Sequence, residues 1–197
     1  MTRKLFAICS LIMLIISLSA CGGLRFSQVS PEAKYFHPQK VAVFPVEIGG
    51  NSAEARGAVE KIVAKVLADK KLFSGITDAE SLNRELSVNE ELRKTTADYL
   101  SKLQTVNFSD PDLSRKIGEI TNTDAFLMVS VDIWSYTMEK EDKVAKVSLG
   151  MQLYEAATGK LMWKAAHQIT ESYVLIKPDL PDVARNVVEK MVVYMPH

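Results

Sequence analysis

The N-terminal segment most constrains how this chain can fold, because it is predicted not to belong to a folded domain. The chain begins with two positive charges, Arg3 and Lys4, and continues into an uncharged, mostly apolar run from Leu5 to Ala20 that ends just before Cys21. A basic start, an apolar stretch and small residues at the end are typical of a cleaved secretory signal. The run is short for a membrane-spanning helix, which needs about 20 apolar residues. The sequence therefore predicts that residues 1–20 are removed.

The end of this segment, Leu18-Ser19-Ala20-Cys21, resembles the lipobox of bacterial lipoproteins. The resemblance implies that the Cys21 sulfur carries a diacylglycerol and that Cys21 becomes the acylated first residue of the mature protein. Two or three acyl chains hold a protein stably on a bilayer, since each buried methylene contributes about 0.8 kcal/mol. Gly22, standing where some lipoproteins have aspartate, implies sorting to the outer membrane, facing the periplasm. The alternatives are an uncleaved anchor, or a plain secretory signal with Cys21 present by chance.

The mature chain has to fold without disulfides, because its two cysteines are Cys9, in the signal, and Cys21. An ordinary hydrophobic core must therefore stabilise residues 40–197, which we predict to form a single domain. Residues 21–39 are polar and are predicted to be a lipidated tether. Removing Arg3 and Lys4 from the 24 basic residues leaves 22 against 24 acidic ones, without a basic stripe. Nucleic acid is therefore not expected as a partner.

Hydrophobic periodicity divides the mature chain into alternating strands and helices. The order is strand, helix, strand, three helices, three strands and a closing helix. It predicts an α/β (α+β) fold with a mixed sheet of about five strands and helices mainly on one face, the last three strands forming an antiparallel meander. The predicted elements are strands at 40–46, 72–76, 125–138, 144–154 and 160–170, and helices at 53–71, from Asp78, from a capping box at Ser87–Glu90, from Pro111 and from Pro181.

Several segments in this order resemble the curli-secretion lipoprotein family (CsgG-like) and its relatives, which include the Pel-polysaccharide lipoprotein PelC and lipoprotein activators of penicillin-binding proteins. The segments are 41–46, 66–73, 78–85, 117–125 and 147–163, the last containing Thr158-Gly159-Lys160. The resemblance runs from about Lys40 to Ile169 and implies a CsgG-like periplasmic domain. Residues 87–107 depart from it and look like an inserted helix.

The sequence offers little that indicates catalysis. Its three histidines, His37, His167 and His197, have no ligand spacing, and neither a nucleophile elbow nor a phosphate-binding loop is present. We therefore predict no enzymatic activity, no metal and no cofactor. Asp132 and His167 could face each other across the sheet, although polar residues on a solvated face are the simpler interpretation.

Trp134 and Trp163 lie in predicted strands and admit two interpretations. They are either core residues or part of a partner-facing sheet surface, where tryptophan is favoured energetically.

The leading hypothesis is a non-enzymatic accessory or scaffold in envelope secretion or assembly, bound to the membrane by its lipid. It would bind protein partners or further copies of itself in a homo-oligomer. An alternative is a monomeric lipoprotein activator of a periplasmic peptidoglycan synthase. That role needs a tether able to cross the periplasm, whereas the lead-in of about 18 residues spans at most roughly 60 Å. A small enzyme or ligand binder is the third hypothesis.

Overall fold

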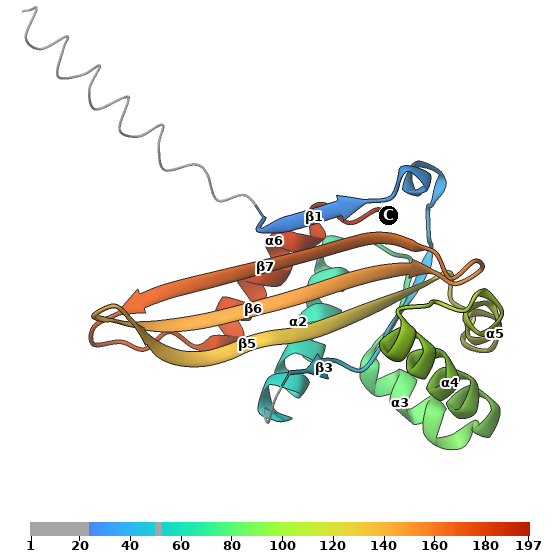
Figure 1. The fold of residues 1–197 in the computed structure, drawn as a ribbon, viewed down its shortest axis with the longest axis horizontal. Helices are drawn as coiled ribbons and strands as arrows, with labels where there is room; N and C mark the ends of the chain where they lie inside the picture. The colour runs from blue at the N-terminus through green and yellow to red at the C-terminus, as the bar shows by residue number, and fades with distance from the viewer. Residues whose placement is uncertain (1–23, 50–52) are drawn as a thin grey trace, which may run out of the picture.

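The structure, a computed structural model, describes residues 24–49 and 53–197, so the predicted signal and Cys21 lie outside it. The strands of the described residues form one seven-stranded sheet in the order β1-β7-β6-β5-β2-β4, and β3 pairs with β5 beyond the end of β2 (Figure 1). The strands are β1 (Phe26–Val29), β2 (Lys40–Val43), β3 (Glu47–Ile48), β4 (Gly75–Thr77), β5 (Ala125–Glu139), β6 (Asp142–Glu155) and β7 (Leu161–Tyr173).

Strands β5, β6 and β7 form the long antiparallel meander that the sequence predicts. Their side chains alternate between the two faces of the sheet, since successive residues of a strand point in opposite directions. In β6, Ala145, Val147, Leu149, Met151 and Leu153 are buried on one face. Strands β2, β3 and β4 add parallel pairs to the other side of the meander, which makes the sheet mixed.

Helices α2 (Ala53–Lys70) and α6 (Leu180–Val192) cover this apolar face. Both have apolar residues at intervals of three and four, which places these residues on one side of a helix. The side chains of Val59, Val63 and Leu67 from α2, and of Val187 and Met191 from α6, are fully buried in the resulting core. No helix in the described part of the chain is long and apolar enough to cross a membrane.

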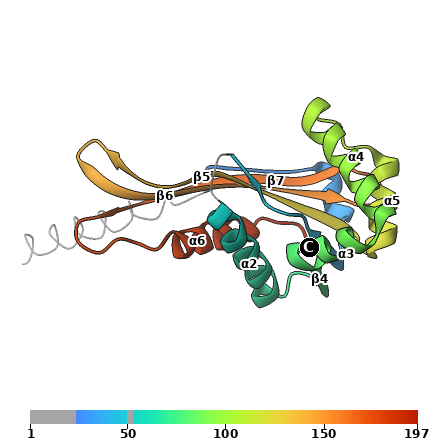
Figure 2. The ribbon, with the colours of Figure 1, turned by 90° about the horizontal axis from the view of Figure 1, so that it is seen from below.

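Helices α3 (Ala79–Val88), α4 (Glu90–Val106) and α5 (Pro111–Thr121) gather at one end of the sheet, and α4 reaches the face opposite α2 and α6 (Figure 2). A second core forms there, in which Phe126 of β5 packs edge-to-face against Phe44 and Tyr99. As predicted, Asp78 caps α3, its side chain accepting the Ser81 N–H, and Pro111 is the first residue of α5. The sequence placed the helices mainly on one face, whereas the structure divides them between both.

The structure also corrects three sequence predictions: the extent of the tether, the number of strands and the capping box. The segment predicted as a tether contains β1 and the 3₁₀ helix η2 (Pro31–Tyr35), and β1 pairs with β7 as an outer strand. With β3, β1 raises the strand number from about five to seven. The capping box at Ser87–Glu90 does not form, because Ser87 still belongs to α3 and the Asn89 side chain caps α4 by accepting the Leu92 N–H at 3.0 Å.

Candidate functional site

The meander presents one face that no described helix covers along most of its length. We call this surface the open face. It lies opposite α2 and α6, and α4 borders it at one end (Figure 2). Two rows of paired residues cross it from strand to strand. They are Ser130–Gly150–Ala166–Phe26 and Met128–Gln152–Lys164–Gln28.

A hollow of about 340 Å³ lies over these two rows, between Phe26 on β1 and Leu103, Gln104 and Asn107 at the end of α4. It exists because Ser130, Gly150 and Ala166 carry almost no side chain. A Cβ at Gly150 would lie 2.6 Å from Ser130 Oγ, so a larger residue there would displace the serine hydroxyl and fill the hollow. The sequence alternation predicts a free face, but the hollow depends on which residues the strand register brings opposite each other.

Hydrogen bonds fix the end of the hollow that adjoins α4. The Tyr154 hydroxyl donates to Gln152 Oε1 at 2.8 Å, and Gln104 Nε2 donates to Glu47 Oε1 at 2.7 Å. Burial, with smaller contributions from Tyr99 and Glu47, raises the pKa of Tyr154 to about 12. Tyr154 therefore stays a neutral hydrogen-bond donor at physiological pH. The bond between Gln104 and Glu47 joins α4 to β3 beside the open face.

Asp132 occupies a β-bulge at which the pairing of β5 with β6 slips by one residue. Its carboxylate accepts hydrogen bonds at 3.4 Å from the hydroxyls of Ser130 and Ser148 and lies on the open face. His167 points to the opposite face, toward α6. The structure therefore does not bring Asp132 and His167 together, and the hypothesis that they face each other is wrong.

His167 connects β1 to the buried face of the meander. Its Nδ1 accepts the backbone N–H of Arg25 at 3.3 Å, and its Nε2 is buried without a hydrogen-bond partner among the described residues. Burial, followed by the nearby charge of Lys190, lowers the pKa of His167. The imidazole is therefore neutral at physiological pH and acts as a packing residue under β1.

The two tryptophans occupy different environments. Trp163 is fully buried in the core beneath the sheet, and its Nε1–H donates to Ser27 Oγ at 3.2 Å. This burial corrects the partner-facing interpretation for Trp163. Trp134 is half-buried against the same core, so its partner-facing role stays a prediction.

The open face offers hydroxyls, amides and small side chains, with Lys164 and Asp132 as separate charged groups. Within residues 24–49 and 53–197, no three histidine, cysteine, aspartate or glutamate residues come close enough to hold a metal ion. A wide sheet surface of low charge with a shallow hollow is suited to contact with another macromolecule.

The chain shares its fold with PelC. The PelC dodecamer from Paraburkholderia phytofirmans matches 87% of this chain and 95% of that chain, with a TM-score of 0.57 and 16% sequence identity. A variant PelC dodecamer from the same organism matches 81% and 89%, with a TM-score of 0.53 and 16% identity. The hypothetical protein CT253 from Chlamydia trachomatis matches 78% and 93%, with a TM-score of 0.54 and 10% identity. No family model matches the sequence, and no curated protein matches it. The likeness to PelC therefore shows the fold alone.

Proposed function

We infer that this protein is an acylated lipoprotein of the outer membrane, facing the periplasm, that self-associates and serves as a non-enzymatic scaffold in envelope secretion or assembly. The observation that carries the proposal is the match to PelC, a dodecamer, over nearly the whole length of both chains. The lipobox-like segment ending at Cys21 supports the membrane anchor. The CsgG-like motifs from Lys40 to Ile169 support the assignment to secretion or assembly.

The open face is the surface that we assign to the contact between copies. Six of the eight residues in its two rows are small or polar, the exceptions being Phe26 and Met128, and Lys164 is the single charged residue among them. A contact between this face and a different surface of the next copy is heterologous, and heterologous contacts close into rings when the rotation between copies allows it. Such a contact also accounts for a sheet face that the chain's own helices leave uncovered.

The alternative, a monomeric activator of a peptidoglycan synthase, conflicts with the place where the domain begins. Because β1 starts at Phe26, only four residues lie between Cys21 and the sheet, a span of at most about 18 Å. The predicted lead-in of residues 21–39 would have reached roughly 60 Å. An acylated chain with this short connection stays close to the membrane and does not cross the periplasm.

The test is the mass of the full acylated protein in detergent, measured by light scattering after size exclusion. We expect a discrete oligomer of ring size, and a monomer would contradict the proposal.

A charge-bearing variant of the open face locates the contact. Ala166→Arg places a charge in the hollow and is expected to yield monomers whose thermal unfolding matches that of the wild type. Glu85→Arg, on the exposed side of α3, is the control and should keep the oligomer. An oligomer that survives Ala166→Arg would show that the open face is not the contact.

A further inference from the structure

The pairing of β1 with β7 leaves very little chain between the lipid anchor and the folded domain. Leu24 already packs against the core beneath the sheet, and β1 begins two residues later. If Cys21 is acylated, as the proposed function holds, three residues precede Leu24, with a span of at most about 11 Å. The lipid surface must then lie within about that distance of Leu24.

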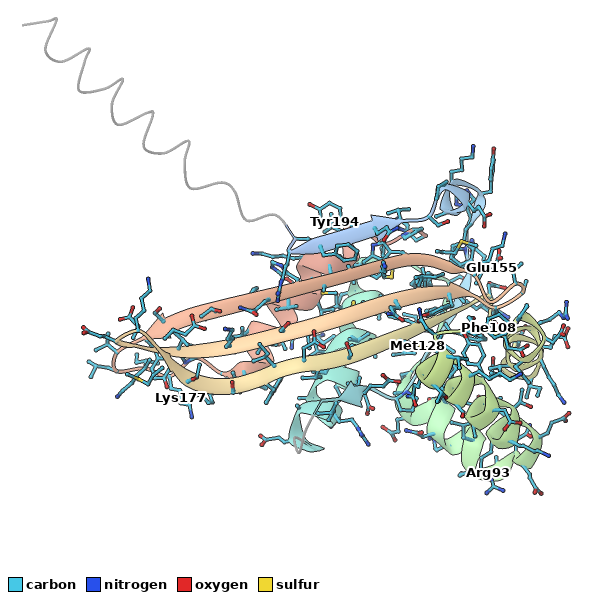
Figure 3. All side chains as sticks on the ribbon, in the orientation of Figure 1. Arg93, Phe108, Met128, Glu155, Lys177 and Tyr194 are labelled. Atoms are coloured by element: carbon cyan, nitrogen blue, oxygen red, sulfur yellow. The ribbon has the colours of Figure 1, made fainter. Side chains whose placement is uncertain are left out.

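The surface around Leu24 is rich in exposed apolar side chains. As an outer strand, β1 pairs with β7 on one side, and Phe26 and Val29 are 43% and 50% exposed along it. Figure 3 shows Tyr194, which follows the end of α6, at the same side of the molecule as β1, and Figure 2 shows that the end of α6 lies in the layer beneath the sheet. Tyr194 and its neighbour Val193 are 51% and 68% exposed.

Basic groups accompany these apolar side chains. Arg25 immediately precedes Phe26, and Lys164 Nζ lies 5.4 Å from the centroid of the Phe26 ring. Lys190 lies in the last turn of α6, near Val193 and Tyr194. Aromatic rings together with lysine and arginine are typical of surfaces that lie at the membrane interface, since the rings enter the headgroup region while the cations meet lipid phosphates.

We propose that the outer edge of β1 and the adjoining end of α6 form the surface that rests on the bilayer. This surface, the membrane edge, consists of Arg25, Phe26, Val29, Val193 and Tyr194, and it meets the open face at Phe26, which also lines the hollow. It is the edge of the sheet and not a face, so the sheet stands upright on the membrane. The open face is then directed sideways, along the plane of the membrane, where it meets a second copy anchored in the same leaflet.

A second group of exposed apolar residues, at the far end of the meander, lies outside the reach of the anchor. Met138, Val174, Leu175 and Ile176 belong to this group. Ala166 pairs with Phe26, and β7 runs seven further residues to Tyr173, a length of about 23 Å. The short connection to Cys21 therefore places the anchor at the membrane edge and not at this second group.

Depth-dependent quenching in vesicles tests the membrane edge. Cys21 is the one cysteine of the mature chain, and acylation blocks its sulfur, so introduced cysteines can be labelled singly with a fluorophore. Val29→Cys and Tyr194→Cys report on the membrane edge. Val88→Cys is the matched control, since Val88 is 85% exposed at the end of α3. The acylated proteins are reconstituted into phosphatidylethanolamine–phosphatidylglycerol vesicles that carry nitroxide-labelled lipids.

We expect several-fold stronger quenching at positions 29 and 194 than at position 88, and equal quenching by a water-soluble quencher in the absence of vesicles. Mass spectrometry of the N-terminal peptide first establishes that the protein is acylated. If acylated protein is quenched no more strongly at positions 29 and 194 than at position 88, the membrane edge is wrong and the proposed function still stands. An N-terminal peptide without the acyl mass would overturn both.

Discussion

Two glycines show how adding a single methyl group can raise the free energy of unfolding at one position of this fold and lower it at another. Gly118 in α5 faces the turn after β6, where a Cβ would lie 2.7 Å from Ala156 Cβ and 3.0 Å from the Thr123 carbonyl oxygen. Gly57 in α2 has no atom within 4 Å of its Cβ position. We expect Gly118→Ala to lower the free energy of unfolding by about 1–3 kcal/mol through overpacking. Gly57→Ala should raise it by about 0.8 kcal/mol through helix propensity. Urea denaturation followed by circular dichroism measures both, and shifts of the same sign would contradict this account.

His167 makes stability depend on pH in a definite direction. Its pKa is lowered in the folded protein, chiefly by burial and further by Lys190, whereas the unfolded chain binds a proton near pH 6.5. The unfolded state therefore holds more protons below about pH 6.5, and the free energy of unfolding falls as the pH decreases. His167→Gln should flatten this dependence between about pH 7 and pH 5.5, measured by urea denaturation at each pH. The control His37→Gln changes an exposed histidine and should keep the wild-type slope, and a wild-type slope in His167→Gln would count against the argument.

At the scale of elements, three helices end with a residue in the left-handed region, but with different side chains. Asn107 after α4 and Asn122 after α5 have φ of 52° and 51°, and Lys71 after α2 has φ of 53°. Asparagine adopts this conformation at little cost in free energy, whereas lysine adopts it at a larger cost. Lys71→Gly should therefore raise the free energy of unfolding by about 0.5–1 kcal/mol. Lys70→Gly, one residue earlier and inside α2, should lower it by about 1 kcal/mol. Thermal unfolding of both variants measures these changes. Destabilisation by Lys71→Gly would contradict the conclusion that the left-handed conformation of Lys71 costs free energy.

The elements that the sequence predicted correctly are those whose apolar residues recur at a regular helical or strand spacing. The helical stripe of α2 and the alternation in β6 are local, so the order from β2 to α6 is confirmed, with β3 as the addition. Strand β1 could not be predicted, because its four residues are all exposed and it exists through pairing with β7. The hollow of the open face escaped prediction for the same reason. It needs Ser130, Gly150 and Ala166 in one row, and this row follows from strand register and not from any local pattern.

At the scale of the whole molecule, the meander extends well past α2 and α6, so its two ends differ in support (Figure 2). Residues 125–127 of β5 pair with β2 and residues 130–131 with β3, as well as with β6. Beyond them, β5 pairs with β6 alone among the described strands. Here Tyr136 supplies the support, since its hydroxyl donates to the Pro178 carbonyl oxygen at 2.8 Å and its ring lies 3.4 Å from Lys177 Nζ.

Hydrogen exchange should reveal this gradient of stability along a single strand. Peptides covering residues 133–139 are expected to exchange at least about tenfold faster than those covering 125–131, because local opening requires less free energy where fewer partners are lost. Tyr136→Phe removes the hydrogen bond to Pro178 and should speed exchange at 133–139 while leaving 125–131 unchanged. Tyr173→Phe is the matched control, since it keeps the ring that packs edge-to-face on Tyr136 and should leave both segments at wild-type rates. Equal protection along β5 would mean that residues 133–139 are as stable as residues 125–131. Pairing with β2 and β3 would then not determine the local stability of the strand.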